Sequence, residues 1–475
     1  MKQIRHRTGA VTEVERTTAK KNKYEIDMCN GTIMDKLISF SLPLMLSGIL
    51  QLMFNAVDII VVGRFSGSQA LAAVGSTSAL INVFTNLFIG ISLGANVLTA
   101  RFYAAGREKE VSETVHTAIT LALVSGIIMA LVGLVFSRGA LALMGTPDDV
   151  IGLSALYMRI YFLGMPFFML YNYGAAILRA VGDTKRPLLF LVIAGVINAC
   201  LNMVLVIVFK LGVAGVAIAT VISQMISCVL VLRCLCQSKT SYQLRFSELG
   251  MKGYYLKQIF SVGVPAGIQS TVINFSNVLL QSSVNSFGST AMAGYTAANN
   301  LLGFLYVSVN SITQACMSFT SQNYGVGKLK RMDRVLADCM ILSVVVAVVL
   351  GCICYGFGPE ILQIYTEDAE VIACGMEILA YTTITYFLCG WMDLFPGALR
   401  GMGYSAVPMV LSVIGTVGTR VVWIFGIFPY HRSLAILFIS YPASWIITIV
   451  LQVICFYFVR RRVHRRSQAL AGQEG

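Results

Sequence analysis

The stretch LRAVGDTKRP, residues 178–187, returns half a chain later as LRGMGYSAVP, residues 399–408. Leucine, arginine, glycine and proline occupy the same places in both copies. At the same spacing, the tyrosine and a glycine of FYAAGREK, residues 102–109, fall on those of NYGVGKLK, residues 323–330. Self-similarity at a fixed long period indicates a duplicated structural unit. The 475-residue chain is therefore predicted to be one unit written twice.

The composition places both copies in a lipid bilayer. Apolar residues make up 57% of the chain and charged residues only 12%, whereas a soluble domain carries about 25% charged residues. A helix needs ~20 mostly apolar residues to cross a bilayer, and twelve such stretches occur, six in each half: residues 36–62, 70–100, 113–143, 153–179, 187–209, 213–235, 258–284, 292–322, 335–357, 372–398, 408–428 and 434–459. Extended β-alternation is absent from the sequence. We predict an all-α integral membrane protein with twelve transmembrane helices in two parallel six-helix repeats.

An even number of spans makes the second repeat enter the membrane in the same direction as the first, so a pseudo-two-fold axis along the membrane normal is expected. The predicted organisation is a cytoplasmic tail (1–32), an N-lobe (33–236), a cytoplasmic linker (237–257), a C-lobe (258–460) and a basic cytoplasmic tail (461–475). A seam between two similar lobes that opens to either side is the simplest device for alternating access. The duplication therefore favours transport.

The basic residues set the predicted orientation, since Lys and Arg concentrate on the cytoplasmic side of membrane proteins. Nearly all of the 35 Lys and Arg residues lie in the terminal segments and in the connections after even-numbered spans. The opposite side has only Arg64, Arg138, Lys210 and Arg432. Both termini are therefore predicted to be cytoplasmic, in a multi-pass protein of the inner (plasma) membrane. This topology and contact with anionic lipid account for the net charge of +13 without a nucleic-acid partner.

The chain offers little for enzyme chemistry or for a bound cofactor. Its four His are scattered, its twelve Cys include no Cys-x-x-Cys pair, and no glycine-rich phosphate loop of the Walker type occurs. We expect no catalytic residue, no metal and no cofactor other than a coupling ion, H⁺ or Na⁺. An integral-membrane enzyme, the competing class, should present His or carboxylate clusters at one depth. No feature indicates oligomerisation, so a monomer is expected, and the polar start of the chain lacks a cleavable secretory signal.

Polar residues inside the predicted spans mark possible routes for a solute, because a polar group in hydrocarbon needs a partner or a wet cavity. Two stripes at helical spacing are Gln51, Asn55 and Asp58 in the first span and Ser270, Asn274, Asn277 and Gln281 in the seventh. Hydrogen bonding between helices is the commonest use of such residues, but the equivalent places of the two stripes in the repeat favour a shared cavity. The predicted substrate cavity is lined by Gln51, Asn274, Asn277 and Gln281, with Tyr161 from an aromatic cluster suited to cationic solutes.

Asp58 is the sharpest candidate for ion coupling. Removal from water disfavours the ionised form of a carboxylate, so Asp58 could take up and release a proton near neutral pH. It could equally bind sodium with help from Asn55, or it could be a static carboxylate held by hydrogen bonds. Asn198 and Asn202, one helical turn apart in the fifth span, complete the predicted ion-coupling site.

Two more charges lie inside the predicted spans of the second half. Asp393 is ~10 Å of helix rise from the cytoplasmic end of the tenth span, and Arg420 is ~18 Å from that of the eleventh. Neighbouring antiparallel helices can bring such charges together, and each charge in lipid needs a partner. We predict a structural charge pair between Asp393 and Arg420.

The chain resembles the multidrug and toxic compound extrusion (MATE) transporters. The resemblance rests on FNAVDIIVVGRFSGSQALAAVG at 54–75, FYAAGREKEV at 102–111 and the two LRxxGxxxxP elements, and it spans residues 33–460. It implies a bacterial twelve-helix antiporter that expels amphipathic or cationic drugs and toxic compounds in exchange for protons or sodium. Asp58 falls on the family's acidic position in helix 1. Many relatives have Asp in an Asn-x-x-x-Asp arrangement in helix 5, where this chain has Asn198 and Asn202, so the coupling ion stays open.

Two other transporter classes compete with this interpretation. A major-facilitator carrier also has six plus six helices, but it should carry a Gly-x-x-x-Asp-Arg-x-Gly-type loop after the second span, which residues 102–111 lack. A lipid-linked oligosaccharide flippase of the same superfamily is closer. Several of those proteins have two extra helices and more basic cavities.

The predicted topology has a direct test in Arg107 and Lys328, which lie in equivalent connections of the two repeats. Each position is changed singly to cysteine in a protein whose native cysteines are replaced. A membrane-impermeant maleimide should label neither position in intact cells and both in inverted vesicles. Labelling of the two positions from opposite faces would contradict the parallel repeats and the transport interpretation with them.

Overall fold

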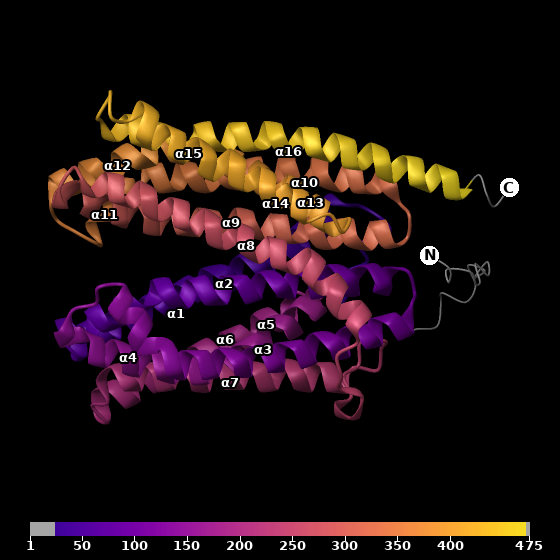
Figure 1. Ribbon diagram of the computed structural model, residues 1–475, viewed down its shortest axis with the longest axis horizontal. Coiled ribbons are helices and arrows are strands. Elements are labelled where there is room, and N and C mark those ends of the chain that lie inside the picture. The colour runs from indigo at the N-terminus through magenta and orange to yellow at the C-terminus, as the bar shows by residue number, and fades with distance from the viewer. Residues whose placement is uncertain (1–23, 472–475) are drawn as a thin grey trace.

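The computed structural model describes residues 24–471, and this part of the chain is helical, without strands. The helices form two bundles side by side, drawn in Figure 1 from indigo to magenta for the first half and from pink to yellow for the second. The start of the described chain and the end of the last helix lie at the same end of the molecule (Figure 1), here called the termini end. The predicted tail residues 1–23 and 472–475 lie outside the described residues.

The first bundle contains six helical crossings. Its elements are α1 (Met34–Phe65), α2 (Ser68–Ala104), α3 (Glu108–Leu143), α4 (Asp148–Leu163), α5 (Met165–Ala180), α6 (Lys185–Asn202) with the π-helical η2 (Met203–Val208), and α7 (Gly212–Gln237). A short 3₁₀ turn, η3 (Phe246–Glu248), lies in the connection to the second bundle. We call the two bundles the N-lobe and the C-lobe.

The C-lobe repeats this order. Its elements are α8 (Gly253–Asn285), α9 (Ser289–Gly325), α10 (Leu329–Gly356), the short α11 (Gly358–Gln363), α12 (Ala369–Thr382), α13 (Tyr386–Gly401), α14 (Ala406–Ser412), η4 (Val413–Gly418), α15 (Thr419–Val422), η5 (Trp423–Ile427) and α16 (Leu434–Ala471). The segments α14, η4, α15 and η5 follow one another as a single crossing, in the place that α6 and η2 take in the N-lobe. The six-plus-six prediction is therefore met.

The fourth crossing of each repeat is bent. Helices α4 and α5 meet at 47°, and α12 and α13 meet at 51°. Eight single helices of the described chain are long and apolar enough to cross a membrane, and each bent pair adds one crossing. The remaining two crossings are α8 and α9, which are 33 and 37 residues long but more polar. A bend at the same place in both lobes supports the duplication.

The first helix of each lobe starts against the other lobe. Near the termini end, Leu37 and Phe40 of α1 pack with Ile312 and Phe319 of α9, and the Phe40 and Phe319 rings meet edge to face at 5.6 Å. The first half of α8 lies against α2 in the same way, and Figure 1 shows α8 running obliquely from one bundle to the other. Each helix carries a proline at the equivalent place, Pro43 and Pro265. These two crossed helices join the lobes.

Glycines allow α2 and α8 to touch backbone to backbone. A Cβ atom built on Gly90 would lie 2.3 Å from the Cα of Gly267, and one built on Gly94 would lie 2.2 Å from the carbonyl oxygen of Ile259. No side chain fits into such a contact. Small residues that permit close helix approach are a common means of helix association in lipid. The α2–α8 contact is therefore a fixed crossing point of the two lobes.

The segment 24–33, which we call the strap, binds both lobes and is not the free tail expected for residues up to 32. Its N-lobe and linker partners are Tyr103, Tyr242 and Gly182, and its C-lobe partners are Asn323, Lys328 and Arg331. Tyr103 and Tyr242 donate to the Glu25 carboxylate at 2.6 and 2.7 Å. Burial raises the pKa of Tyr242, so this hydroxyl keeps its proton as a donor. The strap therefore ties the lobes together at the termini end.

The glycine contact predicts which valine substitution in α2 weakens the protein. Gly90→Val should lower the midpoint of heat-induced aggregation in detergent, because overpacking costs about 1–3 kcal/mol. Gly75→Val is the matched control, since a Cβ atom at Gly75 meets nothing within 4 Å. Equal midpoints for the two variants would contradict the backbone contact.

Candidate functional site

A cluster around Asp58 joins three helices of the N-lobe. The Asp58 side chain is only 8% exposed. Its carboxylate accepts a hydrogen bond from Asn202 Nδ2 of α6 and one at 3.3 Å from Thr220 Oγ1 of α7. Asn202 Nδ2 also donates to Asn198 Oδ1 at 3.1 Å. The sequence-predicted residues Asp58, Asn198 and Asn202 are thus brought together.

Local packing positions this cluster. Gly195 of α6 leaves room for the ring of Phe54, whose Cζ atom lies 1.8 Å from where a Cβ atom on Gly195 would be. Asp58 follows Phe54 by one helical turn, so this close approach holds it beside Asn198 and Asn202. Asn202 is the last residue of α6 before the π-helical η2. π-Helical turns inside α-helices occur frequently at functional sites.

Only part of the predicted coupling set enters this cluster. The Asn55 side chain is exposed and makes no hydrogen bond recorded among residues 24–471. Thr220 was not foreseen, because a lone threonine in an apolar span gives no sign in the sequence of which helix it faces. Tyr161 stacks on Tyr157 at 6.2 Å, and both tyrosines lie within electrostatic reach of Asp58. The aromatic cluster therefore adjoins the carboxylate.

A second cluster surrounds Arg420 of α15 in the C-lobe. Arg420 Nη1 donates to Ser276 Oγ and to Asn277 Oδ1, both at 2.7 Å. The guanidinium carbon lies 4.7 Å from the centre of the Tyr441 ring, and the Tyr441 and Tyr295 hydroxyls are 2.9 Å apart. This cluster contains Asn277 of the predicted cavity stripe. Its other members were not predicted.

The charge pair predicted between Asp393 and Arg420 is not among the ion pairs of the described chain, which makes this prediction wrong. Asp393 instead interacts electrostatically with Arg400, two turns further along α13. Arg400 Nη2 donates to Gln269 Oε1 at 2.6 Å. The physical reason is that Arg420 directs its hydrogen bonds to Ser276 and Asn277 of α8, whereas Asp393 lies near Arg400 on its own helix.

The other polar residues of the predicted cavity stripes make no hydrogen bond to the Asp58 or Arg420 cluster among the described residues, and their place in a cavity stays a prediction. Gln51 and Asn274 are exposed. Gln281 donates to Asn285 at 3.1 Å on its own helix. Among the described residues no group of three or more His, Cys, Asp or Glu could hold a metal ion. Any cation bound at Asp58 would thus have a single carboxylate, supplemented by amide and hydroxyl oxygens.

Buried hydrogen bonds close the seam between the lobes near the termini end. Ser318 Oγ donates to Asn96 Oδ1 at 3.1 Å, and Asn96 Nδ2 donates to the Ala176 carbonyl at 2.8 Å. Gln322 Nε2 donates to the Ala180 carbonyl at 2.7 Å. These small polar residues were missed, because nothing in the sequence separates them from ordinary helix contacts. The lobes are locked together on this side.

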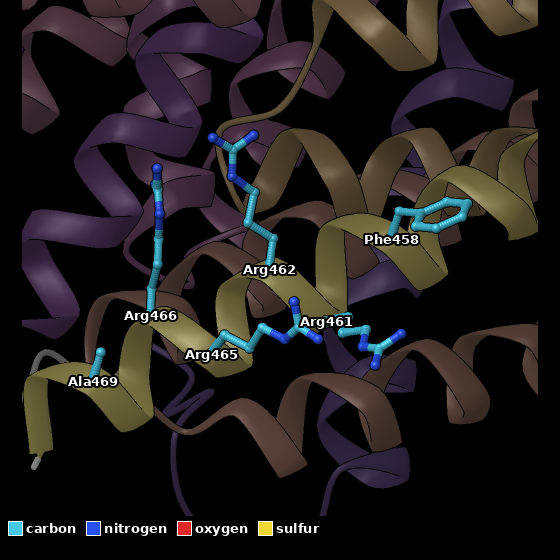
Figure 2. Close-up of a pocket in the computed structure, with 6 residues that line it drawn as sticks. All are labelled: Phe458, Arg461, Arg462, Arg465, Arg466 and Ala469. Atoms are coloured by element: carbon cyan, nitrogen blue, oxygen red, sulfur yellow. The ribbon is translucent and has the colours of Figure 1, made fainter.

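A basic pocket lies outside the bundle core, at the end of α16. Figure 2 shows its lining residues Phe458, Arg461, Arg462, Arg465, Arg466 and Ala469. The neighbouring Arg460 binds the Asp333 carboxylate through two hydrogen bonds, at 2.7 and 2.6 Å. Arginine clusters beside a membrane-spanning helix attract anionic lipid headgroups. This pocket suits the predicted contact with anionic lipid, and it lies away from the polar clusters of Asp58 and Arg420.

Comparison with known protein families finds the same family in both halves of the chain. The MatE family model matches residues 43–204 and again 265–425. "Probable multidrug resistance protein YoeA" of Bacillus subtilis (strain 168) is 31% identical over 434 residues, which cover 89% of this chain and 93% of that protein. "Probable multidrug resistance protein NorM" of Thermotoga maritima is 26% identical over 393 residues, 80% of this chain and 83% of the relative.

Solved structures match the whole architecture. The structure described as "Outward-facing conformation of a multidrug resistance MATE family transporter of the MOP superfamily" superposes with a TM-score of 0.85 at 20% identity, over 95% of this chain and 100% of that one. The likeness confirms the predicted all-α fold of two six-helix repeats. The family match confirms the resemblance drawn from the sequence.

The hydrogen bonds of Asn202 predict a difference between two asparagines on neighbouring helices. Asn202→Ala should lower the heat stability of the purified protein, because loss of a buried hydrogen-bond partner costs about 1–3 kcal/mol. Asn55→Ala should leave stability unchanged, since its side chain is exposed. Both are measured as aggregation midpoints in one detergent. A larger loss for Asn55→Ala would mean that the cluster is wrongly placed.

Proposed function

Because the chain belongs to the MATE family of transporters, we propose that it exports amphipathic and cationic compounds from the cell, in exchange for protons or sodium ions. The family membership makes it a multi-pass transporter of the plasma membrane and not an enzyme. The single observation that carries the coupling proposal is the Asp58 carboxylate, which is buried in a membrane-spanning bundle and whose hydrogen-bond partners among residues 24–471 are neutral.

The chemistry of the Asp58 cluster suits reversible cation uptake. Asn202 and Thr220 donate to the carboxylate, and neither brings a charge that would fix its ionised state. Asn202 Oδ1 is buried and has no donor among the described residues. Such an acceptor beside a carboxylate can receive a hydrogen bond from a protonated Asp58 or act as a ligand to a sodium ion. Uptake of either cation neutralises the cluster.

A change of charge at Asp58 would act on α1, the helix that connects the lobes. The outer half of α1 contacts α6 through Phe54 and Asp58, while its first half packs on α9 of the C-lobe. Breaking the bond from Asn202 to Asp58 removes one of the contacts that hold the outer half of α1 on α6. A cation that alters this bond therefore biases the packing between the lobes, which is the coupling that exchange requires.

The closed seam shows at which end of the molecule the path between the lobes is shut. With the termini end on the cytoplasmic side, as the distribution of Lys and Arg predicts, the hydrogen bonds of Ser318 and Gln322 seal the protein against the cytoplasm. Alternating access then requires these bonds and those of the strap to break. We expect the protein to act as a monomer, without a nucleic-acid partner.

Asp58→Asn tests the coupling role, because the amide keeps the size of the side chain and cannot take up a proton or carry a charge. In proteoliposomes, a pH gradient and a sodium gradient are imposed separately, and uptake of a fluorescent lipophilic cation is followed. Asp58→Asn should lower gradient-driven transport at least tenfold under whichever gradient drives the wild type.

Asp149→Asn is the matched control, because Asp149 is an exposed acid at the start of α4. It should transport at the wild-type rate. Unchanged transport by Asp58→Asn at equal protein levels would remove Asp58 from the coupling mechanism. No transport by the wild type under either gradient would refute the proposed function.

A further inference from the structure

Arg420 is a buried cation without a carboxylate beside it. Its side chain is only 3% exposed. Its neighbours include Tyr441, Tyr295 and Cys389, which are neutral side chains. No carboxylate of the described residues forms an ion pair with it. Asp393, the acid that the sequence suggested as its partner, faces Arg400 instead. An ionised group in a low-dielectric interior is costly unless it is paired, so this arrangement calls for an anion that the chain does not supply.

The free edge of the guanidinium has the geometry for that anion. Both recorded hydrogen bonds of Arg420 come from Nη1, to Ser276 and Asn277. Nε is buried and has no acceptor among the described residues, and no hydrogen bond of Nη2 is recorded there. Nε and Nη2 form the two parallel N–H groups that bind a carboxylate in bidentate fashion. The protein thus orients the arginine through Nη1 and leaves Nε and Nη2 without an acceptor among the described residues.

Surrounding residues hold the arginine in place and supply a polar approach. The Tyr441 ring lies under the guanidinium, and Tyr441 is itself fixed by the Tyr295 hydroxyl. Asn277 is half-buried, and Asn274, one turn earlier on α8, is exposed. An anionic group that reaches Asn274 can therefore follow the polar face of α8 to Arg420.

We infer that Arg420 binds the carboxylate of those amphipathic organic substrates that carry one. This inference rests on the proposed export function and specifies its substrate class. The two lobes then offer opposite charges, a carboxylate at Asp58 and a guanidinium at Arg420. A zwitterion has one group suited to each.

Two dyes that differ in one group provide the test. Rhodamine B carries a cationic xanthene and a free carboxylate, whereas its ethyl ester carries the same xanthene with the carboxylate masked. Binding of each dye to the purified full-length protein is measured by fluorescence polarisation, and transport is measured in the proteoliposomes described above. Arg420→Gln should weaken binding of rhodamine B at least tenfold and change binding of the ester less than twofold.

A lysine variant separates the effect of the planar N–H pair from that of the positive charge, and a second variant serves as a control. Arg420→Lys keeps the positive charge without the planar fork, and it should recover only part of the affinity for rhodamine B. Arg432→Gln removes an exposed arginine that donates to Ser286, and it should leave the binding of both dyes unchanged. Benzoate, added to the wild type, should displace rhodamine B but not the ester, which tests the site without any substitution.

The outcomes are distinct for the two proposals. An equal loss of binding for both dyes in Arg420→Gln would make Arg420 a structural residue and overturn the inference, and so would a failure of benzoate to displace rhodamine B. Transport of the ester by the wild type would still support the export function in that case. Failure of the wild type to transport either dye under either gradient would refute the export function, and the inference with it.

Discussion

The lack of hydrogen-bond partners in the lipid core decides where this chain can keep polar side chains. Backbone groups are satisfied within helices, which is why the described chain has no strands. A buried polar side chain is stabilised there by a partner on another helix or on its own backbone. Asn96, Ser318 and Gln322 do so across the seam, and in doing so they hold one lobe against the other. The same contacts thus satisfy buried polar groups and pack the two lobes together.

The duplicated architecture carries charges of opposite sign. Each lobe has an ionisable side chain held by neutral hydrogen-bonding groups on neighbouring helices: Asp58 with Asn202 and Thr220, Arg420 with Ser276 and Asn277. Both lie between the first helix of their lobe and the crossing that contains π-helical turns. The repeat therefore supplies the same framework twice, while substitution within it has made the two halves chemically different. Two such halves can bind groups of opposite charge: the lobe with Asp58 suits a proton or a sodium ion, and the lobe with Arg420 suits an anionic group of an organic substrate.

The closed end of the seam is held largely by neutral contacts, beside one from Arg101 to the Gly401 carbonyl. Glycine backbones touch at Gly90 and Gly267, and amide or hydroxyl groups bond to carbonyls across the lobes. A neutral hydrogen bond contributes only about 0.5–1.5 kcal/mol net, because water replaces it when it breaks. Contacts of this kind can be lost and remade together without the desolvation cost of buried ion pairs. The strap adds bonds to both lobes, so any opening of this end must also release residues 24–33.

The amino-acid sequence by itself determined the medium, the twelve crossings and the duplication, because hydropathy and a long repeat are properties of the chain read residue by residue. It also brought Asp58, Asn198 and Asn202 forward, since their spacing places each on a definite helix face. Tertiary structure alone decided their partners: Thr220 completes the Asp58 cluster, and Arg420 lies beside Ser276 and Asn277 instead of Asp393. The physical reason is that a side chain's partner depends on the depth and rotation of the neighbouring helix, and the bends of 47° and 51° and the close glycine contacts that set these appear only when the helices pack.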